Sequence, residues 1–154
     1  MPIKNILLFV AFFLCTHQGV TQDRYISFEL GGSGGIASIN FEKTLTVLGS
    51  NRYSMRYGLS FAPIDKNNGN AFIFPVMIHG KWGKNNHFAD VGIGQSFTIT
   101  TRGSAFVRMP LSMGYRFEPE NKRYYLRASY TPIISYLFNF QWENWAGLTF
   151  GYAF

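Results

Sequence analysis

Bulky apolar residues alternate with small or polar residues along most of this chain after about residue 25. In residues 145–154, for example, every second residue from Leu148 to Phe154 is large and apolar, and glycine, threonine or alanine lies between them. Side chains of a β-strand point to opposite faces in turn, so this period of two indicates a strand with one bulky and one small face. No comparable stretch has helical periodicity. The pattern predicts an all-β fold.

Eight such segments follow one another, separated by clusters of Gly, Asn, Asp and Pro that are typical of turns. The expected strands cover about residues 25–32, 35–43, 52–61, 71–82, 89–99, 105–117, 125–131 and 145–154. The glycine-rich residues 32–35 are expected to form a tight hairpin turn. Pro75, Pro110 and Pro132 fall inside expected strands, where proline removes a hydrogen bond between strands, so we expect bulges or strand ends there.

Charged residues in the expected strands gather on the faces opposite the bulky ones. They are Glu29, Glu42, Arg56, Lys81, Asp90, Arg108, Arg116 and Arg127. A soluble barrel would bury its bulky faces, whereas a barrel in lipid turns them outward. A Lys or Arg on the lipid face near the bilayer centre costs roughly 2 to 4 kcal/mol. The division of faces therefore predicts an eight-stranded antiparallel up-and-down transmembrane β-barrel, which leaves no open strand edge.

The interior of an eight-stranded barrel is only wide enough to be filled by side chains. We therefore expect the charged residues to pair with one another across the interior as a lumen charge network, with His79 as a further partner. The lumen is then polar and filled. A small pore, lined by the same charges, is the alternative.

The first residues have the composition of an export signal. Lys4 provides a positive charge, and residues 6–15 form an apolar run that is too short to cross a bilayer as a helix. We expect residues 1–22 to be a cleaved signal peptide and residues 23–154 to form the barrel domain. Cys15 lies in the signal, so the remaining chain has no cysteine for disulfides or thiolate chemistry.

Composition narrows the class of protein further. Charged residues make up 14% of the 154 residues and aromatic residues 18%, whereas soluble domains have about 25% charged residues. The net charge of +6 is spread without a Lys/Arg cluster, which argues against a nucleic-acid partner.

Three scattered histidines offer no metal-ligand spacing, and no cofactor is expected. His79 and His87 have no paired nucleophile, so we expect no catalysis; a lipid-modifying barrel enzyme is the alternative.

Aromatic residues crowd the last expected loop. Phe138, Phe140 and Trp142 lie within residues 135–145. Exposed aromatic patches often mark contact sites, so these three residues form a hypothetical surface-contact loop for a partner protein, glycan or lipid. A strand pair that protrudes through the membrane interface would also be aromatic.

Three features of the chain occur together in one known family. They are the strands with bulky faces outward, residues 114–117 (Gly-Tyr-Arg-Phe) and the ending at residues 151–154 (Gly-Tyr-Ala-Phe). With them the chain resembles the small bacterial outer-membrane β-barrels of the OmpA/OmpX type, most closely the compact barrels common in Bacteroidota. The resemblance implies that both termini are periplasmic. It also implies that the outer-membrane assembly machinery reads a C-terminal signal, here Leu148, Phe150, Tyr152 and Phe154.

These expectations describe a non-enzymatic protein of the cell outer membrane with a structural or adhesive role. Its expected partners are the lipid bilayer, the assembly machinery and an unidentified extracellular partner. A soluble secreted β-barrel that binds an apolar ligand is the alternative from a different class. It requires the bulky faces to point inward, so the direction of those faces separates the two classes.

Overall fold

The computed structural model describes residues 24–66, 69–120, 122–136 and 140–154. The expected signal peptide, including Cys15, lies outside these residues and stays a prediction. Among the described residues, no helix is long and apolar enough to cross a membrane.

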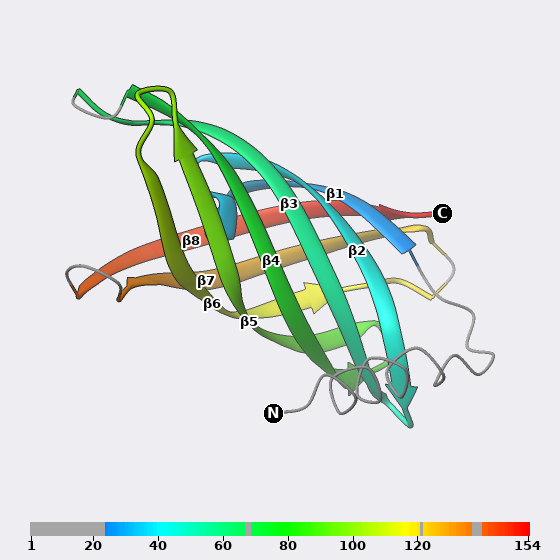
Figure 1. Ribbon diagram of the computed structural model, residues 1–154. Helices are drawn as coiled ribbons and strands as arrows, with labels where there is room; N and C mark the ends of the chain where they lie inside the picture. Colours follow the sequence, from blue (N-terminus) through cyan, green and yellow to red (C-terminus); the bar gives the residue numbers. More distant parts are fainter. Residues whose placement is uncertain (1–23, 67–68, 121, 137–139) are drawn as a thin grey trace, which may run out of the picture.

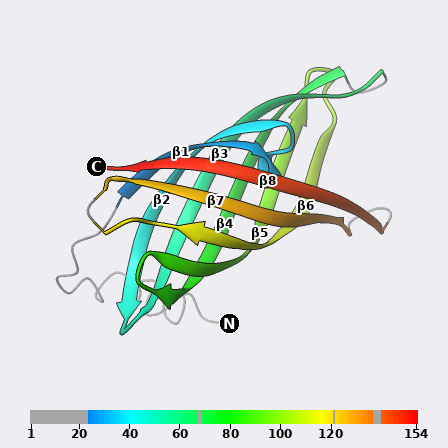
Figure 2. The ribbon, with the colours of Figure 1, turned by 180° about the vertical axis from the view of Figure 1, so that it is seen from behind.

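Eight strands form a closed barrel in which each strand is antiparallel to both of its neighbours (Figure 1). The strands are β1 (Arg24–Gly31), β2 (Ala37–Leu48), β3 (Asn51–Asp65), β4 (Gly69–Lys84), β5 (His87–Thr100), β6 (Ala105–Phe117), β7 (Tyr124–Ser135) and β8 (Gln141–Ala153). The view from behind shows β8 between β7 and β1, where it closes the barrel (Figure 2). The predicted all-β, eight-stranded up-and-down barrel is confirmed.

The two ends of the barrel differ in their connections. We call the end with residues 49–50, 85–86, 118–120 and 122–123 the turn end. Arg24 and Phe154 also lie there, and the Phe154 amide donates to the Arg24 carbonyl over 3.0 Å. We call the opposite end, with residues 32–36 and 101–104, the loop end.

Large apolar side chains cover the outer face of the barrel, and polar or charged side chains fill the inner face. In β1, for example, Ile26, Phe28 and Leu30 are about half exposed, whereas Ser27 and Glu29 are buried. The alternation of buried and exposed positions continues through the central parts of the other strands. The bulky faces therefore point outward, and the alternative of a soluble barrel with inward bulky faces is wrong.

The strands extend beyond the ends that the apolar pattern predicts, most clearly in the β3–β4 hairpin. Pro63 pairs with Asn70, although the sequence pattern placed both residues in a loop. Backbone pairing continues there after the apolar alternation ends, so hydrophobicity alone marks the strand ends too early. This hairpin projects from the barrel at the loop end (Figure 1).

Pro75, Pro110 and Pro132 do not shift the register, so the bulges expected at these three positions are wrong. Pro75 and Pro110 lie in gaps of the β3–β4 and β5–β6 ladders, and each register is the same on both sides of the gap. Pro132 lies within the continuous register of β7 and β8. The missing backbone N–H of proline thus removes hydrogen bonds between strands, but no extra residue is inserted to form a bulge. Register shifts occur instead between Thr44 and Thr46 of β2 and between Pro63 and Asp65 of β3.

The connection between β1 and β2 folds into the barrel rather than away from it. It forms a single 3₁₀ turn, η1 (Gly32–Gly34), whose residues are all buried and which contacts β3, β4, β6, β7 and β8. A Cβ atom added at Gly34 would lie 2.6 Å from the Cβ of Ser38, and one at Gly32 would lie 2.6 Å from the Cδ of Glu29. The sequence predicted a simple hairpin turn here. Gly32 and Gly34 instead allow the chain to enter a space in which a Cβ atom at either position would clash.

Candidate functional site

The interior near the turn end is organised around the carboxylate of Glu42 on β2. Lys81 of β4 donates to it over 3.0 Å, and Arg116 of β6 donates to both of its oxygens over 2.9 Å. Ser54 of β3 donates a further hydrogen bond over 3.0 Å. The Lys81 and Arg116 side chains are fully buried, so one acid holds two bases in the absence of solvent. Such a pair is stable only when its remaining donors and acceptors are also satisfied.

A second cluster lies between Glu42 and η1. Glu29 of β1 contacts Arg56 of β3 at 2.7 Å and Arg127 of β7 at 3.9 Å. Arg127 also lies 3.4 Å from Asp90 of β5, which in turn is 2.7 Å from Nδ1 of His79. All five side chains are buried. Two acids and two arginines thus alternate across the barrel, with the imidazole at one end.

Aromatic rings pack against the cations of the first cluster. The guanidinium carbon of Arg116 lies 3.5 Å from the centroid of the Tyr125 ring and 4.8 Å from that of Tyr25. Lys81 lies 5.3 Å from the Tyr25 ring. The negative faces of these rings stabilise the buried charges in addition to the carboxylates. Sequence analysis did not include either tyrosine in the interior network. The alternation could have found them, because Tyr25 shares a face of β1 with Ser27 and Tyr125 shares a face of β7 with Arg127.

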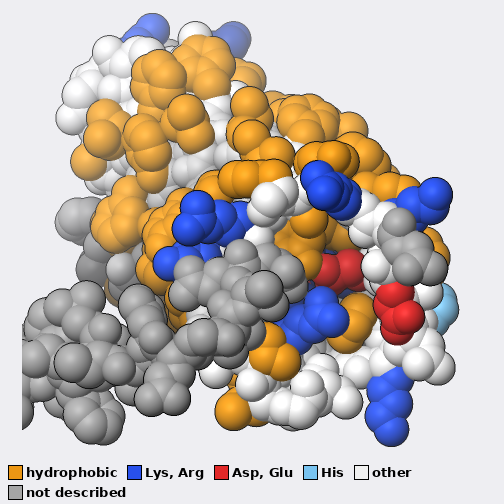
Figure 3. Space-filling view, turned by 90° about the vertical axis from the view of Figure 1, so that its right-hand side faces the viewer, with side chains coloured by type: hydrophobic (Ala, Val, Ile, Leu, Met, Phe, Trp, Pro, Cys, Tyr) orange, Lys and Arg blue, Asp and Glu red, His pale blue; other side chains and the backbone are white. Residues whose placement is uncertain are grey.

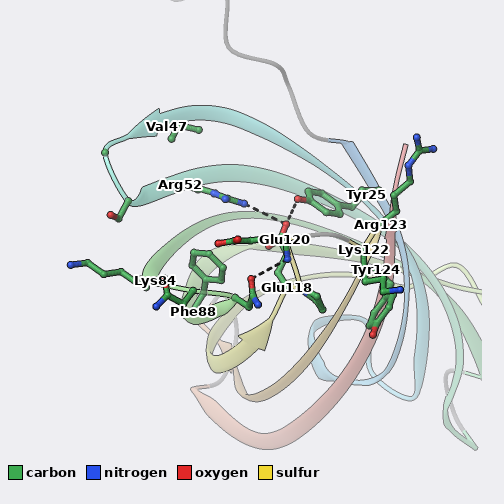
Figure 4. A pocket seen from close by; sticks show the side chains of 17 residues that line it. Tyr25, Val47, Arg52, Lys84, Phe88, Glu118, Glu120, Lys122, Arg123 and Tyr124 are labelled. Carbon is green, nitrogen blue, oxygen red and sulfur yellow. Dashed lines mark hydrogen bonds and ion pairs between the residues drawn. The ribbon is translucent and has the colours of Figure 1, made fainter.

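Glu118 links this interior to the turn end. Its carboxylate lies 3.1 Å from Nε of Arg116 and 3.4 Å from Nη1 of Arg52, and it accepts a hydrogen bond from the Tyr25 hydroxyl (Figure 4). Burial alone would raise the pKa of the Glu118 carboxyl, but the charges of Arg116, Lys81 and Arg52 and the Tyr25 hydrogen bond together lower it. Sequence analysis missed Glu118 because it follows the last residue of β6, where the alternation of faces gives no direction.

A cavity of about 540 Å³ opens at the turn end, next to Glu118. Figure 4 shows Arg52, Lys84, Lys122 and Arg123 among the side chains that line it. Basic side chains gather around this end of the molecule, with acidic side chains between them (Figure 3). The mouth is polar, and the ion pairs of Glu118 lie at its inner side.

The structure brings seven of the eight charged residues proposed for the lumen into these two clusters. Arg108 is the exception, because its guanidinium pairs with Glu143 at the loop end over 3.1 and 3.2 Å. The inner face of β6 is continuous from Arg116 to Arg108, so alternation alone could not distinguish their heights in the barrel. Arg108 therefore pairs with an acid that the predicted network did not include.

The other proposed residues lie on the outer face or outside the described residues. Leu148, Phe150 and Tyr152 are exposed along the outer face of β8, and Phe154 continues the same face. Phe140 is 75% exposed and Trp142 is 49% exposed, with the indole nitrogen bonded to Asn144 over 2.7 Å. Phe138 lies outside the described residues.

The two histidines in the described part of the chain have different surroundings. His79 is buried against Asp90, and the His87 ring stacks on Tyr115 at the turn end. In the described part of the chain, no group of three or more His, Cys, Asp or Glu side chains is placed to hold a metal ion. The described interior holds acidic and basic side chains in fixed ion pairs.

We predict that Glu42→Gln strongly destabilises the barrel, by about 3 to 5 kcal/mol, because it leaves Lys81 and Arg116 buried with less compensating charge. Glu143→Gln is the matched control. Its ion pair is partly exposed, so we expect a loss below about 1 kcal/mol. Urea titration of the refolded protein measures both, and equal midpoints for the two variants would contradict the prediction.

No protein-family model matches the chain. No curated protein matches it either.

Two solved structures share the architecture. The outer membrane protein Ail of Yersinia pestis, in a phospholipid bilayer nanodisc, has a TM-score of 0.58 and 14% sequence identity, and the match covers 86% of this chain and 99% of Ail. The N-terminal β-barrel domain of Pseudomonas aeruginosa OprF has a TM-score of 0.58 and 11% identity, and the match covers 86% of this chain and 96% of that domain. At these identities the likeness concerns the fold. The chain has the eight-stranded fold of the small outer-membrane β-barrels.

Proposed function

We propose that this chain is a non-enzymatic β-barrel of the outer membrane with a filled, polar lumen and a structural or adhesive role. The observation that carries the proposal is the inversion of its faces, with apolar side chains outward and ion pairs inward. Water would penalise such an outer surface, whereas the hydrocarbon of a bilayer matches it. The lipid bilayer is therefore the proposed environment of the outer face.

The location in the outer membrane has two further supports. The fold is that of two outer-membrane barrels, and the expected signal peptide would direct export. We propose that Leu148, Phe150, Tyr152 and Phe154 form the signal for the assembly machinery. Their side chains stand on one outer face of β8, the strand that closes the barrel against β1. A factor that binds β8 before closure could therefore contact all four.

The filled lumen is supported by the packing of the interior. Two charge clusters and η1 follow one another along the barrel, and Ser33 of η1 lies 3.4 Å from the Glu29 carboxylate. Ions that crossed the barrel would need to displace η1 and break buried ion pairs such as Glu29–Arg56. Breaking one such pair costs several kcal/mol, so we propose a lumen that does not conduct.

We predict that Ile93→Arg destabilises the protein in lipid vesicles by roughly 2 to 4 kcal/mol, because Ile93 is 54% exposed at the middle of the outer face of β5. Ala105→Arg, at the loop end of β6, is the matched control near the interface, where the cost is about 0 to 1 kcal/mol. Urea titration and heat-dependent gel migration measure folding. A protein that folds in water without detergent or lipid would contradict the membrane role.

We predict that the refolded wild-type protein gives no discrete current steps in planar bilayers, because paired side chains and η1 occupy its interior. A porin with a larger barrel, inserted into the same bilayers, is the positive control. Sustained single-channel steps from the folded protein would overturn the filled lumen but would leave the membrane location intact.

An adhesive role is supported by the exposure of the last hairpin, where Phe140 is 75% exposed. We predict that Phe140→Ser together with Trp142→Ser lowers the adherence of expressing Gram-negative cells to hexadecane droplets, since both changes remove exposed apolar area. Lys66→Ser, in a loop at the same end, is the control. Unchanged adherence at equal surface expression would remove the adhesive role.

A further inference from the structure

A second cavity, of about 300 Å³, lies inside the loop end of the barrel. Its walls come from β3 to β8 and from the β1–β2 connection. We call it the outer cup. It lies on the far side of η1 from the charge clusters, and it contains Arg108, the charged inner-face residue that does not join them.

One wall of the outer cup is apolar, unlike most of the interior. Ala62, Ala71 and Ile73 form a buried apolar cluster on β3 and β4, and Ala62 and Ile73 line the cup directly. Ile133 of β7 adds a further buried apolar side chain to the lining. Apolar groups around an empty volume lose contact with neighbouring atoms, so a ligand with an apolar part would gain by filling it.

Polar side chains of β6 and β8 also line the outer cup, and together they carry no net charge. Nη1 of Arg108 donates to both carboxylate oxygens of Glu143, and the two side chains are 26% and 39% exposed. The indole nitrogen of Trp145 lies 3.4 Å from the Glu143 carboxylate. Because the two charges neutralise each other, a ligand with a net charge would have to separate them before it gained a partner. A neutral ligand can donate to Glu143 without breaking the pair.

The floor of the outer cup separates it from the rest of the interior. Ser33 of η1 lines the cup and also lies within hydrogen-bond distance of Glu29, at 3.4 Å. Hydrogen bonds also fix the neighbouring loops, since the Thr101 amide donates to the Asn70 carbonyl over 2.8 Å and Arg102 donates to the Lys66 carbonyl over 2.7 Å. The cup is therefore preformed and closed below, which suits binding rather than passage.

We infer that the outer cup binds a small amphipathic molecule without net charge. The apolar part lies against Ile73 and Ile133, and a hydroxyl or amide group meets the pair of Arg108 and Glu143. This inference goes beyond the proposed membrane role, and it does not require a surface contact by the last hairpin.

The test uses three probes with one apolar part, namely 1-hexanol, hexanoate and hexylamine. The full barrel is placed in nanodiscs, and the indole N–H signals of its three tryptophans are followed by NMR during each titration. Trp145 reports on the outer cup, whereas Trp82 and Trp142 are exposed on the outer face and report on partition into the lipid. We expect a saturable shift of Trp145 with hexanol, at least about tenfold tighter than with either charged probe.

Two variants give the result its structural meaning. Ile73→Trp fills the outer cup and should abolish the saturable shift, whereas Ile78→Trp, on the outer face of the same strand, should retain it. Glu143→Gln releases Arg108 from its partner, so the preferred probe should change to hexanoate, by about tenfold over hexylamine. This second variant leaves the apolar wall unchanged and remains informative if Ile73→Trp does not fold.

Three outcomes would overturn the inference. One is a Trp145 shift that is linear and no larger than those of Trp82 and Trp142, which would mean partition into lipid only. Another is tighter binding of a charged probe than of hexanol by the wild-type barrel. The third is an unchanged order of the three probes in Glu143→Gln. None of these outcomes depends on whether the lumen conducts.

Discussion

The pairing of charges inside a narrow barrel is the constraint on which the rest of this structure depends. Each buried acid takes its partners from other strands: Glu29 of β1 from β3 and β7, and Glu42 of β2 from β4 and β6. Removing one partner would leave a charge buried without compensation. A slip of one residue in any strand would also turn its charges to the outer face. The ion pairs and the strand register therefore support each other around the whole circuit.

The interior changes its chemistry from one end to the other. Buried charges dominate from the turn end to Glu29, and η1 separates them from an apolar cluster around Ile73. The outer face is more uniform, because large apolar side chains are exposed on all eight strands. The change from charged to apolar side chains along the barrel axis is thus confined to the interior. There each residue contacts particular neighbouring side chains rather than a bulk solvent.

Much of the fold could be predicted because alternation decides direction. Leu59 and Arg56, for example, have opposite parity on β3, and the structure places them on opposite faces. The position of a residue along the barrel axis was harder to predict. Arg108 and Arg116 have the same parity on β6, so alternation gives them the same face but not their heights. Glu118 was missed because a residue after a strand end has no assigned face. The inward path of residues 32–34 depends on the space left by five other strands, which a local pattern does not contain.

The inward path of η1 also gives the barrel an uneven outer rim. The β1–β2 connection lies within the wall, whereas the β3–β4 hairpin extends past its neighbours and is joined to the β5–β6 connection through Thr101 and Asn70 (Figure 1). A large molecule that approaches the loop end therefore meets this raised sector before it reaches the β1–β2 connection. The sequence of that sunken connection is set by packing inside the barrel.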